Sequence, residues 1–582
     1  MLISDLLAQN ADLYPDEVAL IEIRPSKGIR KVITWQDFDL YANRVANALI
    51  ASGIKKDDRV LHLMMNSIDW LIAYFGIIRT GAWAVPLNFR FTSVEIKYCA
   101  DISEASMMVL GEEFTDRVNA IRRQLPSIGK YVFTGQDTPS GMEPFAVFLD
   151  SGKPRPPAVK LNPEDVCGLY FTSGTTGAPK PIVLTHANME FACVVEQKHH
   201  YQTRDDNFIL VPPLYHTGAK MHWFGSLLAG GHATILTEIS PKAILETVHK
   251  ERGTIVWLLV PWAQDILVAL DKGELKLSDY DLSRWRLMHI GAQPVPPSLV
   301  RRWKQYFPQM QYDTNYGLSE STGPGCIHLG IENIHKVSAI GRAGYGWQTR
   351  IVDNDGKDVP QDVNGEIIVK GAGVMKEYYK NPEKTAETIK DGWLYTGDIG
   401  KADEDGFIWL TDRKKDIIIT GGENIFPVEI EDVLQSHPGI YDAAVIGIPD
   451  ERLGEIAAAV IDPKPGVTLT EQEIADFCAQ HLSRFKRPRR IFFGKVPRSP
   501  TGKIEKPKLR EIQVKAPESR IVIDPKISHG RPVIKGTDVQ VERILAELRG
   551  GMSREEITRE YGITEEDVNA VLAFTATCRE IV

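Results

Sequence analysis

The segment from Tyr170 to Lys180 reads YFTSGTTGAPK and combines hydroxyl side chains, two glycines and a terminal lysine. Glycines let backbone amides approach an anion closely, while hydroxyl groups and an ammonium add donors and positive charge. These residue types predict a loop that binds phosphate groups. A flexible surface loop is the alternative, since a run of Ser, Thr and Gly taken alone is more often a linker.

This loop does not follow the G-x-x-x-x-G-K-S/T pattern of P-loop kinases and GTPases. Pro179 and Ile182 stand five residues after Gly174 and Gly177, where that pattern has its second glycine. The sequence therefore disfavours a P-loop kinase or GTPase.

The elements that must position this loop alternate between helical and strand-like patterns, which indicates a layered α/β fold. VCGLYF before the loop is typical of a strand, and apolar residues at helical spacing predict a helix from Ile33 to Ser52. The runs RVLHLMM, FILVP, TIVWLLVP and LMHIGA have strand length. Loops at the ends of such strands are where α/β sheets bind ligands.

Four further segments follow the loop in a fixed order: NYGLSEST (315–322), YTGD (395–398), DRKKDIIITGGENIFPVEIE (412–431) and PRSPTGKIEK (497–506). Together the five segments resemble the motifs of the adenylate-forming superfamily. This superfamily contains acyl-CoA synthetases, aryl-CoA ligases, peptide-synthetase adenylation domains and firefly-type luciferases. The resemblance extends from residue 1 to about residue 513 and is specific because all five motifs occur in register.

The resemblance implies a two-step reaction that uses ATP, Mg²⁺ and CoA. A carboxylate first attacks the α-phosphate of ATP and forms an acyl-adenylate and pyrophosphate. The CoA thiol then attacks the acyl carbon and releases AMP. Both steps need positive charge and hydrogen-bond donors where negative charge accumulates.

The resemblance also assigns roles to residues that handle the phosphates. Glu320 would bind Mg²⁺ together with the Thr172 hydroxyl, because Mg²⁺ prefers oxygen ligands. Lys503 would contact the α-phosphate and the carboxylate oxygens. The β- and γ-phosphates would be held by the loop residues Thr172, Ser173, Gly174, Thr175, Thr176 and Gly177 and by Lys180.

Two further sets of residues would bind the nucleoside and the CoA. Asp398 would accept hydrogen bonds from the ribose hydroxyls with the help of Arg413, and Lys415 would lie at the hinge between two domains. The adenine and its surroundings would be contacted by the GAQP segment (Gly291 to Pro294, with Ala292 and Gln293) and by Asn315, Tyr316, Gly317 and Ser319. The pantetheine tunnel would be lined by the GGEN segment, with Gly421, Gly422 and Glu423.

Each catalytic residue taken alone has a structural alternative. Asp398 fits a turn residue, Glu320 fits an acid at a helix start, and Lys503 fits a solvated lysine in a Pro-Thr-Gly turn. The ordered motifs favour the functional interpretation of all three.

The acid-binding part is less well marked. PLYHTGAKMHWFGSLLAGG would place His216 near the carboxylate, although a core or gating histidine fits equally well. Met221, Trp223 and Trp257 are candidate pocket walls. These side chains favour a medium-chain, alicyclic or aromatic acid over acetate.

Composition and charge exclude several other classes. The chain has 582 residues and a formal net charge of −9, which disfavours general binding of nucleic acid. Its six cysteines form no CxxC pair, as expected for reduced thiols in a cytoplasmic protein. No secretory signal is visible, and the most apolar stretch, LIAYFGIIRTGAWAVPLNF, is too interrupted to span a membrane. We therefore expect a soluble protein.

We expect three domains: a large α/β adenylation domain with several subdomains (1–411), a mobile α+β ligase domain (412–514) and a small helical extension (519–582). The extension resembles an antitoxin-like domain of the DUF433 type. From Arg520 onward it holds nine Lys/Arg and eleven Asp/Glu, a net charge of −2, which disfavours DNA binding. Docking of a protein partner or self-association is the favoured role, and an inert tail is the alternative.

The favoured function is an ATP-dependent acid–CoA ligase. Two alternatives stay open: an adenylating enzyme that loads a carrier protein or another acceptor, and a regulatory binding protein that acts through its antitoxin-like tail. The presence of Lys503, Glu320 and Asp398 disfavours the regulatory alternative, and no carrier-protein segment follows.

Overall fold

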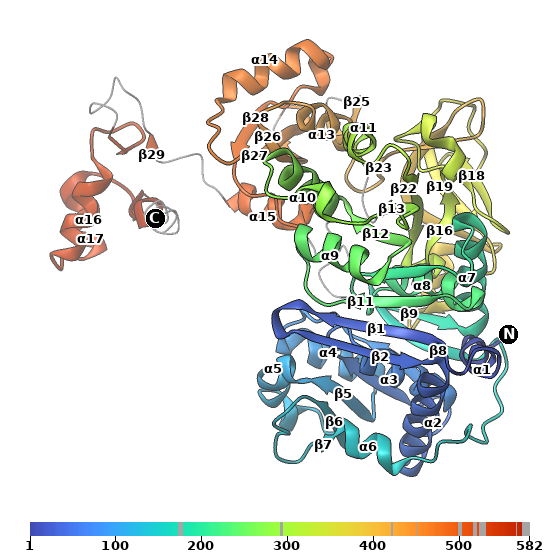
Figure 1. Cartoon of the computed structure of the whole chain (residues 1–582). Helices are drawn as coiled ribbons and strands as arrows, with labels where there is room; N and C mark the ends of the chain where they lie inside the picture. The colour runs from blue at the N-terminus through green and yellow to red at the C-terminus, as the bar shows by residue number, and fades with distance from the viewer. Residues whose placement is uncertain are drawn as a thin grey trace.

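The computed structural model describes residues 1–172, 179–291, 295–420, 423–450, 452–498, 503–515, 521–522, 531–565 and 567–572. Two large sheets with helices between and outside them form the first part of the chain, as Figure 1 shows. The predicted α/β fold class is confirmed.

The first large sheet contains the two strands that flank the predicted phosphate loop, β8 and β9, close to one edge. Its inner strands are parallel, and the edge strands β8, β9 and β20 pair antiparallel. The strand order is β20 (Glu377–Tyr378), β9 (Lys180–Thr185), β8 (Val166–Thr172), β4 (Trp83–Pro86), β3 (Arg59–Leu63), β5 (Met107–Gly111), β6 (Lys130–Thr134) and β7 (Glu143–Pro144).

The second large sheet is parallel except for its last strand. Its strand order is β14 (Gln311–Asp313), β13 (Leu287–Gly291), β12 (Ile255–Leu259), β10 (Asn207–Leu210), β11 (His232–Leu236), β1 (Val18–Arg24) and β2 (Ile29–Thr34).

Helices fill the space between the two sheets and share one apolar core with both of them. These helices are α1 (Ile3–Leu13), α2 (Trp35–Ala51), α3 (Ile68–Arg79), α7 (His186–His200) and α8 (Thr217–Ala229). The apolar stretch noted in the sequence is α3 followed by β4, and it is buried because this helix lies in the middle layer. No helix of the described residues combines the length and apolar character that crossing a bilayer requires.

Helix α2 starts two residues later than the sequence predicts. Thr34 is its N-cap and accepts a hydrogen bond from the backbone N–H of Asp37, which fixes the start of the helix. Helix α6 (Phe145–Ser151) packs on α2 and joins the core between the sheets. The other helices of this part cover the outer faces: α4 (Ser93–Ser103), α5 (Thr115–Asn119), α9 (Pro241–Glu251), α10 (Val260–Asp271) and α11 (Pro297–Tyr306).

Two smaller antiparallel sheets carry the nucleoside motifs. One contains β15 (Asn315–Leu318), β16 (Gly323–His328) and β17 (Arg342–Ala343). The other contains β18 (Gln348–Val352), β19 (Gly365–Lys370), β22 (Trp393–Ala402), β21 (Ile389–Lys390) and β23 (Ile408–Arg413), with helix α12 (Pro382–Thr388) nearby.

After β23 the chain forms a smaller α/β unit with its own core. Its strands are β24 (Ile418–Thr420), β25 (Glu423–Ile425), β26 (Ile440–Asp450), β27 (Gly454–Pro463) and β28 (Arg490–Phe493), and its helices are α13 (Pro427–Gln435), α14 (Glu471–His481) and α15 (Lys506–Lys515). We call this unit the small domain.

The C-terminal segment has a separate apolar core and stands apart from the rest in Figure 1. It contains β29 (Ile521–Val522), β30 (Val533–Ile534), α16 (Val541–Arg549) and α17 (Arg554–Tyr561). Ser553 and Glu556 form a capping box at the start of α17, and Gly562 ends this helix with a φ of 62°. In addition to the predicted helices, the segment contains a short antiparallel pair of strands, β29 and β30.

Candidate active site

Both ends of the predicted phosphate loop lie on the paired strands β8 and β9. Thr172 is the last residue of β8 and lies opposite Lys180, the first residue of β9. The Thr172 hydroxyl donates to the carbonyl oxygen of Lys180 at 3.4 Å. The hairpin therefore holds these two side chains at the sheet edge. The loop residues Ser173, Gly174, Thr175, Thr176 and Gly177 lie outside the described residues.

Glu320 lies in a short 3₁₀ helix (Ser319–Ser321) after β15, and a tyrosine that the sequence analysis missed holds its side chain. The Tyr378 hydroxyl donates to Glu320 Oε1 at 2.9 Å. Tyr378 is on β20, where it pairs with Ile182 of β9, so β9 connects Glu320 with the strand pair that carries Thr172. Burial and the Glu320 carboxylate raise the pKa of Tyr378, which keeps its hydroxyl a neutral donor.

The side-chain oxygens of Glu320 and Thr172 are of the types that bind Mg²⁺. One oxygen of Glu320 receives the Tyr378 hydroxyl, which orients the carboxylate and leaves the other oxygen for a ligand. The Thr172 hydroxyl donates its proton to a carbonyl and so keeps its lone pairs. Carboxylate and hydroxyl oxygens are the ligand types that Mg²⁺ binds.

Asp398 is buried between a tyrosine and an arginine. Tyr316 Oη donates to Asp398 Oδ2 at 2.6 Å, and Arg413 Nε lies 3.1 Å from Oδ1. Asp398 and Arg413 are cross-strand neighbours on β22 and β23. Burial and the Asp398 charge raise the pKa of Tyr316, and Asp398 raises the pKa of Arg413. The Asp398 carboxylate oxygens keep further lone pairs beside these two contacts, which suits an acceptor of hydroxyl hydrogen bonds.

Lys503 comes from the small domain but responds to charges of these other motifs. Desolvation and the Arg413 charge lower its pKa to about 8, while Asp398 and Glu320 oppose this shift. Charged residues from three separate motifs thus act on the Lys503 ammonium, which is protonated below about pH 8.

His216 is the N-cap residue of α8, and its imidazole is buried. Burial lowers its pKa to about 3, and the charges of Lys503 and Lys220 act in the same direction. Its Nε2 is buried, and none of the described residues forms a hydrogen bond with it. His216 is therefore a neutral imidazole whose pKa the charge of Lys503 helps to lower.

The segment after Arg413 connects β23 with the small domain. The Asp412 carboxylate accepts hydrogen bonds from the backbone N–H groups of Arg413 at 2.6 Å and Val428 at 3.1 Å. Lys415 is exposed in the turn that follows, and desolvation lowers its pKa. Gly421 and Gly422 lie outside the described residues, as do the side chain of Glu423 in β25 and the segment Ala292, Gln293 and Pro294.

Three other predicted residues have structural contacts of their own. Asn315 donates through Nδ2 to Glu196 Oε1 at 3.2 Å. A Cβ atom on Gly317 would lie 2.2 Å from the carbonyl oxygen of Gly323, so the close approach of β15 to β16 requires glycine there. The Ser319 carbonyl accepts the N–H of Thr322 at 2.9 Å.

The candidate pocket walls separate into two environments. Trp223 is fully buried and stacks on Phe38 in the core between the large sheets. Trp257 on β12 packs against His222, with 4.3 Å between the ring centroids. The side chain of Met221 lies outside the described part of the chain. Of the two tryptophans, the contacts of Trp223 favour a packing role.

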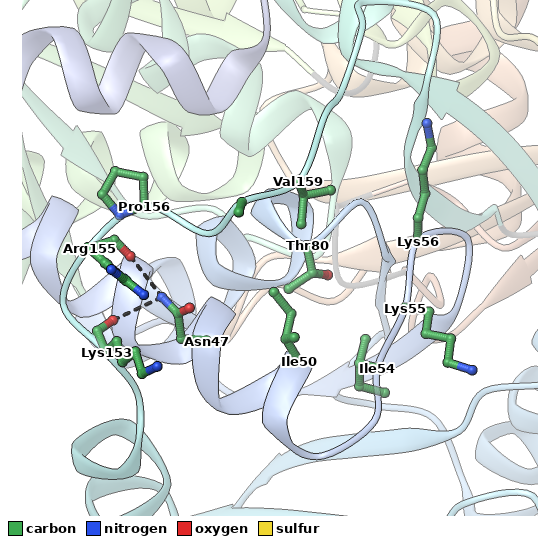
Figure 2. Close-up of a pocket in the computed structure, with 11 residues that line it drawn as sticks. Asn47, Ile50, Ile54, Lys55, Lys56, Thr80, Lys153, Arg155, Pro156 and Val159 are labelled. Atoms are coloured by element: carbon green, nitrogen blue, oxygen red, sulfur yellow. Dashed lines mark hydrogen bonds between the residues drawn. The ribbon is translucent and has the colours of Figure 1, made fainter.

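A surface pocket of about 650 Å³ lies elsewhere, between the end of α2 and the segment 153–159 (Figure 2). Asn47 Nδ2 donates to the carbonyl oxygens of Lys153 and Arg155 at 3.0 and 2.8 Å and so holds this segment in place. No residue of the predicted site is among the described residues that line it: Asn47, Ile50, Ile54, Lys55, Lys56, Thr80, Lys153, Arg155, Pro156, Ala158 and Val159.

Three family models match the chain. The AMP-binding enzyme model matches residues 7–379, and the model of the AMP-binding enzyme C-terminal domain matches residues 429–503. A protein of unknown function, DUF433, matches residues 521–575. The chain therefore belongs to the AMP-binding enzyme family, and the resemblance of its tail to DUF433 is confirmed.

Named relatives narrow the enzyme class. The chain is 31% identical over 513 residues to long-chain-fatty-acid–CoA ligase FadD13 of Mycobacterium tuberculosis, covering 87% of this chain and 97% of that one. It is 34% identical over 483 residues to feruloyl-CoA synthase of Amycolatopsis, covering 82% and 93%. A solved structure of the anthranilate CoA ligase AuaEII in complex with anthranoyl-AMP matches with a TM-score of 0.81 and 27% identity, covering 88% and 97%. The predicted enzyme class, an AMP-forming acid–CoA ligase, is confirmed.

Proposed function

We propose that this protein activates a medium-chain, alicyclic or aromatic carboxylic acid with ATP and transfers the acyl group to CoA. The observation that carries the proposal is the direct contact of Tyr316, Asp398 and Arg413, which come from three different motifs. The charges of Asp398 and Arg413 also act on the Lys503 ammonium. The relatives support the aromatic part of this acid class, because their names include a feruloyl-CoA synthase and an anthranilate CoA ligase.

In the first step Lys503 would contact the α-phosphate and the carboxylate while negative charge accumulates between them. A protonated lysine there stabilises the transition state more than it stabilises the separate carboxylate and ATP anions. Thr172 and Glu320 would hold Mg²⁺, which neutralises phosphate charge when bound. Lys180 and the loop residues Ser173 to Gly177 would bind the outer phosphates.

Asp398 would bind the ribose, since Tyr316 and Arg413 hold its carboxylate in place. We assign the nucleoside contacts to Asn315, Gly317 and Ser319 with Ala292 and Gln293. His216, as a neutral imidazole, would lie beside the acid carboxylate without adding a second positive charge.

In the second step the small domain would rotate about Lys415. We propose the domain division at 1–411, 412–514 and 519–582, with Gly421, Gly422 and Glu423 lining the pantetheine path. Rotation would remove Lys503 and allow the thiol to approach.

The first test is a panel of short, medium, branched and aromatic acids with ATP, Mg²⁺ and CoA, followed by AMP and acyl-CoA formation. Lys503→Ala should lower acyl-adenylate formation by roughly 10²–10³-fold, the size expected for one lost transition-state contact. The same variant should convert supplied acyl-AMP to acyl-CoA at nearly the wild-type rate.

Lys495→Ala is the matched control, because Lys495 is a highly exposed lysine of the small domain that pairs only with Asp462 among the described residues. It should leave both half-reactions unchanged. Equal losses in both half-reactions of Lys503→Ala would contradict the assigned role, and failure to form AMP with any acid would reject the ligase function.

A further inference from the structure

Four histidines and two carboxylates meet in the interior next to Asn315 of the nucleoside motif, which donates to one of these carboxylates. They come from α7 and from four other elements of the large domain, and each residue is at most 3% exposed. The set, which we call the histidine cluster, consists of Glu196 and His200 on α7, His222 on α8, His289 on β13, Asp313 on β14 and His328 on β16.

Several ring nitrogens of this cluster lack a hydrogen-bond partner among the described residues. These are both nitrogens of His289, both nitrogens of His200, and Nε2 of His222 and His328. A buried polar atom without a partner destabilises the fold. A ligand that accepts lone pairs from these nitrogens would remove that penalty.

The carboxylates lie behind the imidazoles in the arrangement that metal sites use. Glu196 Oε2 is 2.7 Å from His222 Nδ1, which leaves Nε2 as the free lone pair. Asp313 Oδ2 and Glu196 Oε2 each lie 3.3 Å from a nitrogen of His200, but neither contact has hydrogen-bond geometry. A carboxylate that orients a metal-binding imidazole is the usual second layer of such sites.

We propose that His200, His222 and His289 bind one divalent transition-metal ion of the Zn²⁺ class. One nitrogen from each of the three rings lies within 4.8 Å of the others. Zn–N bonds of about 2.0–2.1 Å in a tetrahedral site separate the nitrogens by roughly 3.4 Å, so modest side-chain rotations bring all three to one ion. Imidazole nitrogens favour Zn²⁺ and similar ions over Mg²⁺ or Ca²⁺.

A second set, His200 with Asp313 and His328, also comes within 4.8 Å. We place the ion at the first set because Asp313 is already satisfied. Its Oδ1 accepts the N–H groups of Thr314 at 2.8 Å and Gly330 at 3.0 Å, and its Oδ2 contacts His328 Nδ1 at 3.2 Å.

An ion at this position would cross-link the end of α7, α8 and β13. Its neighbours include Trp257, which packs on His222, and Asn315, which donates to Glu196. It would therefore stabilise the wall of the large domain next to the nucleoside motif. This inference does not depend on the acid that the enzyme uses.

The test uses the full chain without an affinity tag, freed of metal with a chelator. Co²⁺ is then titrated while visible ligand-field absorption is recorded, and bound metal is measured by mass spectrometry. We expect about one Co²⁺ per chain with intense tetrahedral bands, displaced by Zn²⁺. Adding the chelator should lower the thermal unfolding midpoint.

His222→Gln and His289→Gln should abolish the bands, and Glu196→Gln should weaken Co²⁺ binding roughly tenfold as a positioning variant. His186→Gln is the matched control, because His186 is equally buried on α7 and both its nitrogens also lack partners among the described residues. Near-ultraviolet circular dichroism of each metal-free variant checks its fold.

Absence of a stoichiometric ion in the wild-type chain would overturn the inference, as would wild-type affinity in both His222→Gln and His289→Gln. A second outcome is that the wild-type chain binds no metal and that His222→Gln changes the acid preference. This outcome would show that the cluster is a polar wall of the acid site instead. That result would leave the ligase function intact.

Discussion

Tyr378 lies outside the motifs that define the family resemblance, yet it contacts the predicted metal ligand directly. Its hydroxyl is 2.9 Å from Glu320 Oε1, and its strand pairs with β9 beside the phosphate loop. One donor of this kind fixes which carboxylate oxygen faces the ion.

Tyr378→Phe should therefore raise the Mg²⁺ concentration needed for half-maximal ATP–pyrophosphate exchange by roughly tenfold. Tyr379→Phe is the control, because this neighbour contacts Trp83 through its ring, which the change preserves. An unchanged Mg²⁺ requirement in Tyr378→Phe would show that Glu320 does not depend on this contact.

Lys503 gives the enzyme a pH dependence of predictable sign. Its pKa is lowered to about 8, so the ammonium is present below that pH and is lost as the pH rises through it. The kcat/KM of adenylate formation should therefore fall above about pH 8. Lys503→Ala should lack this high-pH decline in its residual rate, and a decline that persists in the variant would assign it to another group.

At the scale of elements, the strands decide which motifs meet. Strand β9 pairs with β8 on one side and with β20 on the other. Strand β15 approaches β16 so closely at Gly317 that no side chain fits between them. The nucleoside motif depends on this second pairing, because Tyr316 on β15 reaches Asp398 from there.

Gly317→Ala should separate β15 from β16, since its Cβ would lie 2.2 Å from a backbone oxygen. We expect a loss of about 1–3 kcal/mol in the stability of the large domain and a raised KM for ATP. Gly494→Ala is the control: its Cβ would meet no described atom within 4 Å, and its stability should change by less than about 0.5 kcal/mol. Equal unfolding midpoints for the two variants would contradict the packing argument.

At the scale of the whole molecule, the C-terminal segment is a separate unit. Its apolar side chains, among them Ile521, Ile544, Ile557 and Val568, pack on one another in a core of their own. A unit with its own core can be removed without exposing the core of its neighbour.

Truncation after Lys515, the last residue of α15, should leave both half-reactions within about twofold of the full chain and change the assembly state or the capture of a protein partner. Steady-state kinetics and light scattering measure the two effects. Complete loss of turnover in a folded truncation would give the tail a part in catalysis.

The sequence by itself determined what depends on neighbours along the chain. The capping box at Ser553, the strand before the phosphate loop and the residue types of the five motifs are local features, set by neighbours along the chain. Only the tertiary structure decided that Tyr378 contacts Glu320 and that four histidines meet in the interior. It also decided that the charge of Asp398 acts on the pKa of Lys503. These contacts join residues far apart in sequence, and the packing of sheets and helices sets their distances, which no spacing along the chain specifies.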